Sequence, residues 1–169
     1  CGQNIKYDSL ILKRHGIELK GVSFDSMIAE YMLHPEKNSY KIDYLAIDYL
    51  NYRMVPIDDL IGTGLHQKSM AEVPLEDIAF YASEDADIAF QLAGILKDKL
   101  EKESLFEPYD DIEIPLIPVL TTIEKNGVYL NLDFLAELYR KLGEELEKLT
   151  EKIHQLAGRE FNINSPKQL

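Results

Sequence analysis

The feature that most constrains this fold is a pair of long segments with helical spacing of apolar residues. One runs from Leu75 to about Leu105, and the other opens at Asn131 or Asp133 and ends at Gly158. The second segment carries leucine or isoleucine at steps of three or four residues, which is typical of one long helix that packs on a neighbour. A coiled coil is a weaker interpretation, because the repeat is short and changes phase.

Shorter segments with helical spacing fill most of the remaining chain. We expect Asn4 to cap a helix that ends at Gly16 and packs through Tyr7, Leu10 and Ile11. Further helices are predicted from Asp25 or Ser26 to His34, at residues 41–50, at residues 58–62, and at residues 107–126 with bends at Pro115 and Pro118.

Only short extended segments are visible, at residues 21–24 and 127–129. A sheet made of these alone would be too small to be stable by itself. Either further strands are only weakly signalled or the rest of a sheet precedes residue 1, and we favour the second. The predicted fold class is α/β, mostly helical.

Composition and charge limit the possible functions. Hydrophobic residues make up 46% of the 169, enough for a packed core, and no run approaches the ~20 apolar residues of a membrane span. The single cysteine excludes an internal disulfide and a thiolate metal site. A net charge of −12 opposes broad contact with phosphates, but it is compatible with acidic groups that bind divalent cations. We expect most of the acidic residues to lie on solvated helix faces.

The segment at residues 80–87 places a carboxylate within an apolar stripe. One helical face carries Ile78, Tyr81, Asp85, Ile88 and Leu92. A half-buried aspartate is costly unless a metal, a cation or hydrogen bonds compensate it, so Asp85 and Tyr81 form a candidate site. The plainer alternative is a rim aspartate bonded to Tyr81 or to nearby backbone. Glu84 and Asp87 point elsewhere, and we expect both to be solvated.

A second candidate is Asp8, in the sequence Asn-Ile-Lys-Tyr-Asp at residues 4–8. It lies in the first turn of its predicted helix, where the helix dipole favours an anion. It is therefore either a functional carboxylate or an acid that complements the dipole.

Taken together, these motifs resemble those of a known family. Residues 2–8 (Gly-Gln-Asn-Ile-Lys-Tyr-Asp) and 81–87 (Tyr-Ala-Ser-Glu-Asp-Ala-Asp) resemble the second and third exonuclease motifs of bacterial family A DNA polymerases. These belong to the DEDD exonuclease superfamily, in the branch with tyrosine in the last motif. The resemblance continues at residues 24–27, 114–120 and 124–128, and residues 161–169 resemble the start of the polymerase domain. It covers nearly the whole chain.

The resemblance implies a division of the chain and a mechanism. Residues 1–106 would be the C-terminal part of a ribonuclease-H-like 3′-5′ exonuclease domain, and residues 107–169 the start of the polymerase domain, leading toward the thumb. It implies phosphodiester hydrolysis with two Mg²⁺ or Mn²⁺ ions. Asp85 would bind one ion, Asp8 would help to hold the second partly through water, and Tyr81 would position the attacking water.

The resemblance also implies the partners. Gln3 and Asn4 would lie near the 3′-terminal nucleotide, and Ile57 would contact its bases. The substrates would be a single-stranded 3′ end and a primer-template, and the enzyme would be a cytoplasmic, nucleoid-associated monomer that does not bind membranes.

The chain departs from the family pattern in its first motif. That motif supplies an Asp-x-Glu pair, and the only comparable sequence, at residues 111–113, follows the third motif. We therefore expect the chain by itself to have no exonuclease activity, and no polymerase activity without palm and fingers motifs. Residues 37–41 differ from relatives that have arginine and histidine there, which leaves their role with DNA open.

Three alternatives remain. The first is a catalytically degenerate, exonuclease-like structural module of a family A polymerase, although Asp8, Tyr81 and Asp85 together speak against it. The second is a non-catalytic helical interaction domain built on the leucine-striped helix. The third is a stand-alone nuclease acting on RNA, which residues 161–169 disfavour.

Overall fold

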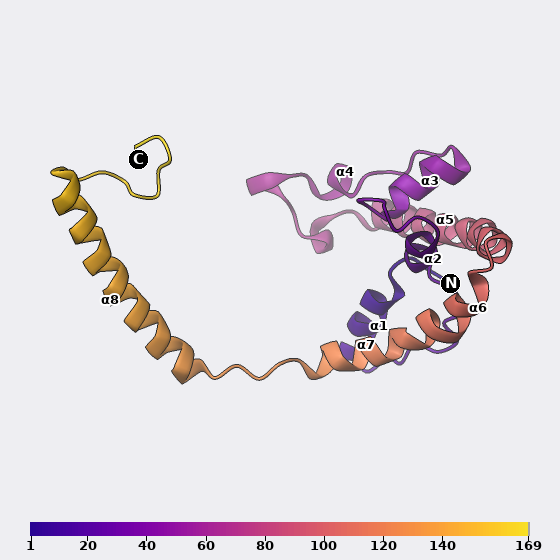
Figure 1. Ribbon diagram of the computed structural model, residues 1–169. Helices are drawn as coiled ribbons and strands as arrows, with labels where there is room; N and C mark the ends of the chain where they lie inside the picture. Colours follow the sequence, from indigo (N-terminus) through magenta and orange to yellow (C-terminus); the bar gives the residue numbers. More distant parts are fainter. Residues whose placement is uncertain (169) are drawn as a thin grey trace. The chain divides into compact units, whose positions relative to one another are not determined.

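The computed structural model describes residues 1–168 and is mostly helical, as predicted (Figure 1). Its α-helices are α1 (Ile5–Arg14), α2 (Ser26–Leu33), α3 (Ile42–Leu50), α4 (Ile57–Ile61), α5 (Leu75–Lys102), α6 (Phe106–Pro108), α7 (Ile114–Asn126) and α8 (Leu132–Ala157). Two 3₁₀ turns, η1 (Gly64–His66) and η2 (Met70–Glu72), precede α5, and a π turn, η3 (Tyr109–Glu113), precedes α7.

Residues 1–168 form no strand, so the sheet of the predicted α/β class is not found within them. In place of a strand at residues 21–24 there is one parallel bridge between Gly2 and Asp25. Gly2 N donates to Phe24 O (3.0 Å), and Ser26 N donates to Gly2 O (2.9 Å). An extended segment becomes a strand only where a neighbour satisfies its backbone groups, and here Gly2 alone does so. Residues 127–129 are irregular as well.

Packing divides the chain into two compact units, Cys1–Gly127 and Val128–Leu169. This division reflects packing alone. The boundary after residue 106, between the exonuclease and polymerase parts, stays a prediction. Leu169, the last residue of the segment that resembles the start of a polymerase domain, lies outside the described residues.

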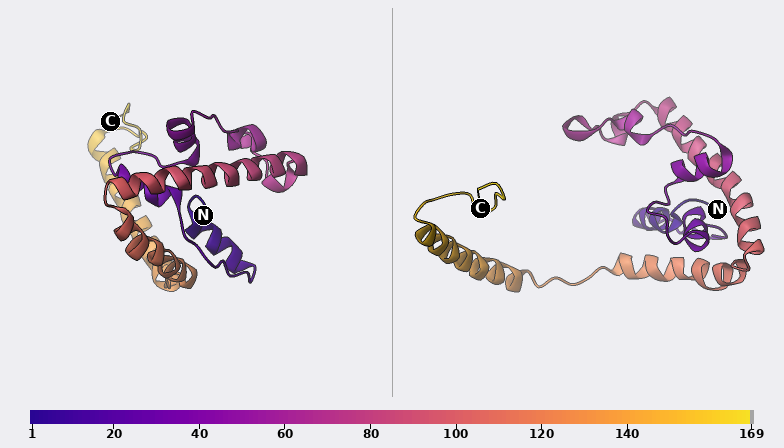
Figure 2. Two further views of the ribbon diagram at one scale, coloured as in Figure 1. Left: turned by 90° about the vertical axis from the view of Figure 1, so that its right-hand side faces the viewer. Right: turned by 45° about the horizontal axis from the view of Figure 1, so that its top comes forward.

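Helix α5 is the centre of the first unit. Helices α2 and α3 lie along it, and α1 lies against α7 (Figures 1 and 2). Leu92, Leu96 and Leu100 of α5 are fully buried. Farther toward the start of α5, Tyr81 and Asp85 are half-buried, so the predicted apolar stripe with a carboxylate in it is confirmed.

The ends of several helices follow the local signals. Asp25 caps α2, Asn131 caps α8 by accepting from Phe134 N (3.0 Å), and Gly158 ends α8 with φ 68°. At the start of α1 the prediction is wrong, because the Asn4 side chain makes no capping bond and its backbone is left-handed (φ 58°).

The packed face of α1 also differs from the expectation. Ile5 and Ser9 are buried, whereas Tyr7 is exposed. The α1 side chain Lys6 pairs with Glu124 of α7, in keeping with the packing of α1 on α7. The face of this short helix is thus set by its neighbours and not by its own apolar spacing.

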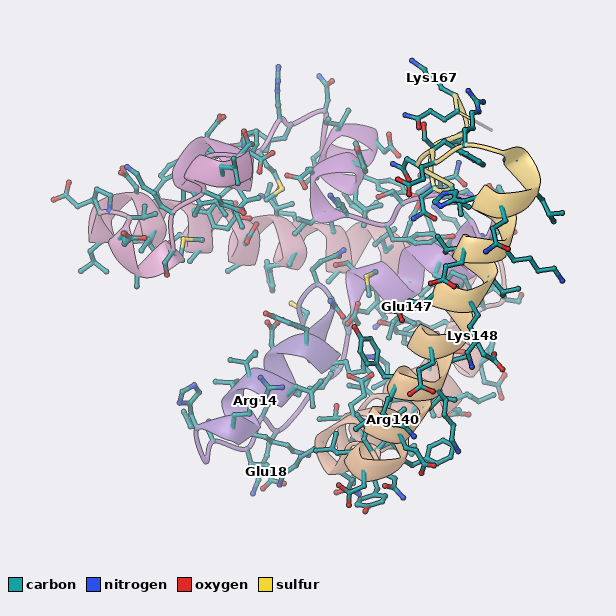
Figure 3. All side chains as sticks on the ribbon, turned by 90° about the vertical axis from the view of Figure 1, so that its left-hand side faces the viewer. Arg14, Glu18, Arg140, Glu147, Lys148 and Lys167 are labelled. Carbon is teal, nitrogen blue, oxygen red and sulfur yellow. The ribbon has the colours of Figure 1, made fainter. Side chains whose placement is uncertain are left out.

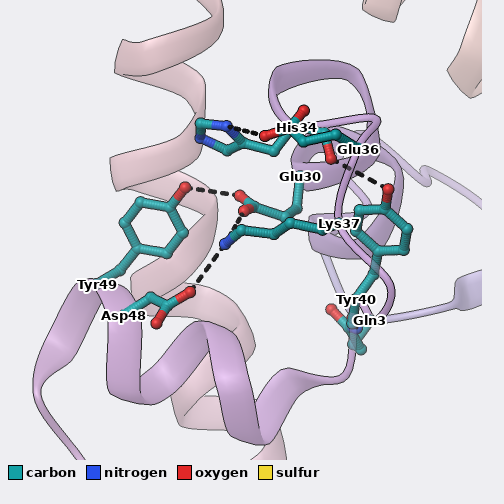
Figure 4. Close-up of polar contacts among 8 residues, drawn as sticks. All are labelled: Gln3, Glu30, His34, Glu36, Lys37, Tyr40, Asp48 and Tyr49. Carbon is teal, nitrogen blue, oxygen red and sulfur yellow. Dashed lines mark hydrogen bonds and ion pairs between the residues drawn. The ribbon is translucent and has the colours of Figure 1, made fainter.

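A buried carboxylate anchors the connection from α2 to α3 (Figure 4). Glu30 of α2 is fully buried and accepts from Tyr49 OH (2.7 Å), while Lys37 Nζ lies 2.7 Å from its other oxygen. Lys37 also pairs with Asp48 (2.8 Å), and these hydrogen bonds to Asp48 and Glu30 raise the pKa of Lys37. The Lys37 cation is therefore engaged within the chain.

The second unit contains α8, which has the predicted length and leucine stripe. Figure 3 shows Arg140, Glu147 and Lys148 projecting from this helix. Spaced ion pairs support its polar face, including Lys141 with Glu137 at 2.7 Å. None of the helices found in residues 1–168 is both long enough and apolar enough to cross a bilayer.

Candidate active site

Helix α5 presents Tyr81 and Asp85 one turn apart on its half-buried face. The Asp85 Oδ1 atom is buried and has no hydrogen-bond partner. Burial, followed by the nearby carboxylates of Asp43, Glu84 and Asp8, raises the pKa of Asp85 to about 6. An unpaired carboxylate oxygen among other acids is unfavourable in the protein alone, and a bound cation would relieve it.

Asp8 lies at the surface in the first turns of α1. Partial burial and the nearby Asp25 carboxylate raise its pKa. Because Asp8 is one of the charges that raise the pKa of Asp85, the two aspartates lie within electrostatic range of each other. The two carboxylates are far apart in the sequence, yet the charge of Asp8 contributes to the raised pKa of Asp85.

Asp43 is a third acid at this site, and it was not predicted from the sequence. Among the neighbouring carboxylates it has the largest effect on the pKa of Asp85, and it also raises the pKa of Tyr81. It lies in the first turn of α3, which packs along α5. No local pattern marks Asp43, because its proximity to Asp85 arises from helix packing.

The prediction that Glu84 is solvated is wrong. Glu84 is buried, and its carboxylate accepts from Tyr52 OH (2.7 Å) and Val55 N (2.9 Å). These two bonds hold the segment after α3 against α5 and compensate the burial of the charge. Asp87 is exposed, as predicted, and bonds to Gln91 (2.8 Å).

Tyr81 combines a packed ring with a protonated hydroxyl. Burial, followed by Asp85, Asp43 and Glu84, raises the pKa of Tyr81 above its ordinary value. The phenol therefore remains protonated at neutral pH, and it can donate a hydrogen bond to an acceptor or orient a water molecule.

Gln3 and Ile57, which we expect near the 3′ end of DNA, differ from each other in their surroundings. The Gln3 amide is bonded at both ends, with Ser26 Oγ donating to Oε1 and Nε2 donating to Tyr40 O (2.6 Å). Ile57 begins α4, is 44% exposed, and lines a pocket of about 220 Å³ that Lys41 and Arg53 also line. Contact of Gln3, Asn4 and Ile57 with DNA stays a prediction.

The donor atoms at this site are carboxylate oxygens, which fit Mg²⁺ or Mn²⁺ better than softer metals. Asp85 has an unpaired oxygen to offer, and Asp8 and Asp43 lie within electrostatic range of it. Within residues 1–168, no group of three or more histidine, cysteine or acidic side chains is close enough to hold a metal ion.

Comparison with known proteins defines the class. Residues 1–101 match the model of a family described as 3′-5′ exonuclease, and the chain belongs to this family. The match confirms the predicted resemblance of this part of the chain to the exonuclease of family A DNA polymerases.

The individual relatives are DNA polymerase I proteins. That of Pseudomonas aeruginosa is 39% identical over 171 residues, covering 99% of this chain and 19% of the relative. That of Chloroflexus aurantiacus is 40% identical over 167 residues, covering 98% and 18%, and that of Bacillus subtilis is 35% identical over 159 residues, covering 94% and 18%. The chain thus spans less than a fifth of the length of these relatives.

A solved structure shares the fold. It is described as the POL domain of Pol1 from M. smegmatis in complex with DNA primer-template and dNTP. The TM-score is 0.79 at 21% sequence identity, over 98% of this chain and 25% of that chain. At this identity the likeness concerns the fold alone.

Proposed function

We propose that this chain is the part of a DNA polymerase I that joins the proofreading 3′-5′ exonuclease domain to the polymerase domain. In this proposal residues 1–106 belong to a ribonuclease-H-like exonuclease, and residues 107–169 begin the polymerase domain. The observation that carries it is the buried, unpaired oxygen of Asp85, a residue whose pKa burial and neighbouring carboxylates raise, one helical turn from a protonated Tyr81. Membership in the exonuclease family supports the same conclusion.

Each residue has a distinct role in this proposal. Asp85 would hold one divalent ion, and Asp8 would help to hold the second. Tyr81, whose hydroxyl stays protonated, would orient the attacking water by a hydrogen bond. Bound Mg²⁺ or Mn²⁺ supplies Lewis acidity and neutralises the charge that develops on the leaving 3′ oxygen.

The whole enzyme would remove mismatched 3′ nucleotides and extend DNA as a nucleotidyltransferase. Its partners would be a single-stranded 3′ end, near Gln3, Asn4 and Ile57, and a primer-template. The M. smegmatis Pol1 structure, which is a complex with DNA primer-template, supports this proposal. The enzyme would act on DNA in the bacterial cytoplasm.

The chain by itself is proposed to be inactive, because Asp8 and Asp85 are too few ligands for a tightly bound metal pair. A 5′-labelled single strand incubated with the pure chain and Mg²⁺ or Mn²⁺ should stay intact. Metal-dependent shortening from the 3′ end that disappears in Asp85→Asn would contradict this.

Metal binding tests the site independently of activity. Substoichiometric Mn²⁺ should broaden the amide NMR signals of residues flanking Asp8 and Asp85, because the paramagnetic ion acts over short distances. Asp85→Asn should abolish the effect, whereas Asp87→Asn, an exposed change on the same helix, should not. Wild-type signals that are unaffected at both places would favour the alternative, a non-catalytic exonuclease-like module.

A further inference from the structure

The Asp25 carboxylate joins the starts of two helices. It is 1% exposed and accepts four backbone N–H groups. As the N-cap of α2, its Oδ1 accepts from Met27 N (2.9 Å) and Ile28 N (3.2 Å). The same Oδ1 accepts from Asn4 N (3.2 Å), and Oδ2 accepts from Ile5 N (2.7 Å). A capping residue ordinarily serves its own helix, but Asp25 also holds the first turn of α1.

The position of Asp25 is itself fixed. Tyr109 is fully buried, and its hydroxyl accepts from Asp25 N (2.7 Å) and donates to Asp25 O (3.1 Å). The bridge to Gly2 holds the residues on either side, through Phe24 O and Ser26 N. The backbone at Asp25 is held from two directions. Its carboxylate is therefore a fixed point to which the first turn of α1 is bonded.

Helix α1 has no cap of its own, because the Asn4 side chain makes no capping bond. Asp8 lies one turn beyond the two amides that Asp25 holds, and the Asp25 charge is close enough to raise the pKa of Asp8. Helix α1 is also held by α7, because Lys6 in its first turn pairs with Glu124. The Lys6–Glu124 pair is exposed, whereas the bond from Ile5 N to Asp25 is buried, so we expect Asp25 to fix the direction of this turn more firmly than the ion pair does.

We propose that Asp25 is a positioning residue of the exonuclease site, which directs Asp8 toward Asp85 by holding the first turn of α1. The proposal rests on the proposed function for the role of Asp8. It adds a residue that contacts neither metal nor substrate and acts through the backbone amides of Asn4 and Ile5.

Asp25→Asn removes the shorter of the two bonds to α1 and keeps the cap of α2. Asparagine is as good an N-cap as aspartate, so its oxygen keeps the Oδ1 bonds and the cap of α2. Its NH₂ group replaces Oδ2, so the Ile5 N–H loses its acceptor. We expect hydrogen exchange at the Ile5 amide to accelerate at least about tenfold, while exchange at Met27 and Ile28 stays within about twofold of wild type.

A second readout distinguishes positioning from stability. In Asp25→Asn, Mn²⁺ should still broaden signals around Asp85 but should lose its effect around Asp8. Asp87→Asn is the matched control, with the same chemical change at an exposed site, and it should alter neither readout. If Asp25→Asn does not fold, Asp25→Ser replaces it, since a single short hydroxyl can cap α2 but cannot also bond to Ile5.

The outcomes separate the two proposals. Unchanged exchange at Ile5, equal acceleration at Met27, or undiminished broadening around Asp8 would overturn the role of Asp25. If wild-type protein shows no Mn²⁺ broadening, the metal function fails, and the exchange rate at Ile5 alone decides whether Asp25 anchors α1.

Discussion

Replacing Asp85 by asparagine should stabilise this protein at neutral pH, although Asp85 is the central residue of the proposed site. Asp85 carries a buried oxygen without a partner, and burial together with neighbouring carboxylates raises its pKa from 3.8 to about 6. A carboxyl group with a raised pKa holds its proton more tightly in the folded state than in the unfolded state. The stability of the wild type should therefore fall as the pH rises from about 4 to about 6.

The magnitude follows from the difference between the two pKa values. At about 1.4 kcal/mol per pKa unit, a rise from 3.8 to about 6 corresponds to at most about 3 kcal/mol. Because Asp85 is only half-buried, solvent screening reduces the expected effect to about 1–2 kcal/mol. Asp85→Asn should exceed the wild type by this amount at pH 7 and should match it near pH 4, where Asp85 is protonated.

Urea unfolding followed by circular dichroism between pH 4 and pH 8 measures this difference. Asp87→Asn is the control, because Asp87 is exposed on the same helix and its loss should change stability by less than about 0.5 kcal/mol. The reasoning is refuted if Asp85→Asn is less stable than the wild type at pH 7, or if the difference between them does not depend on pH.

Three further changes test the packing. Tyr109→Phe removes the hydroxyl that bonds to the Asp25 backbone and should lower the free energy of unfolding, measured in urea, by about 1–3 kcal/mol. The exposed control Tyr139→Phe should have little effect, and equal losses in the two variants would contradict this prediction. Leu92→Ala leaves a cavity in the core and should cost about 2–5 kcal/mol in the same assay; a loss under about 1 kcal/mol would argue against its burial. Gly158→Ala places a Cβ at φ 68° and should cost about 1 kcal/mol, seen as faster amide exchange in the last turn of α8; unchanged exchange would contradict the left-handed end.

The helices could be predicted because their signals are local. Asp25 before α2, and Asn131 and Gly158 around α8, are capping residues beside segments with apolar spacing. The strand at residues 21–24 could not be judged in this way, because a strand depends on a partner elsewhere in the chain. The cap of α1 was also missed, since its acceptor is supplied by a residue of another helix.

The same distinction applies to the site. The half-burial of Asp85 follows from its place in the stripe of α5, and the sequence predicted it. Glu84, one residue earlier, was expected in solvent because nothing local reveals that Tyr52 and Val55 fold over it. Asp43 was missed for the same reason, since only the packing of α3 on α5 brings it near Asp85.

The central claim is that Asp8 and Asp85 serve one metal site, and Mn²⁺ affinity measured by electron paramagnetic resonance tests it most directly. The wild type, Asp8→Asn, Asp85→Asn and the double variant form a cycle in which coupled residues give non-additive losses. We predict that each single variant weakens Mn²⁺ binding, and that the double variant binds little worse than Asp85→Asn. Losses that add independently, or an Asp8→Asn variant that binds Mn²⁺ as the wild type does, would contradict a shared site.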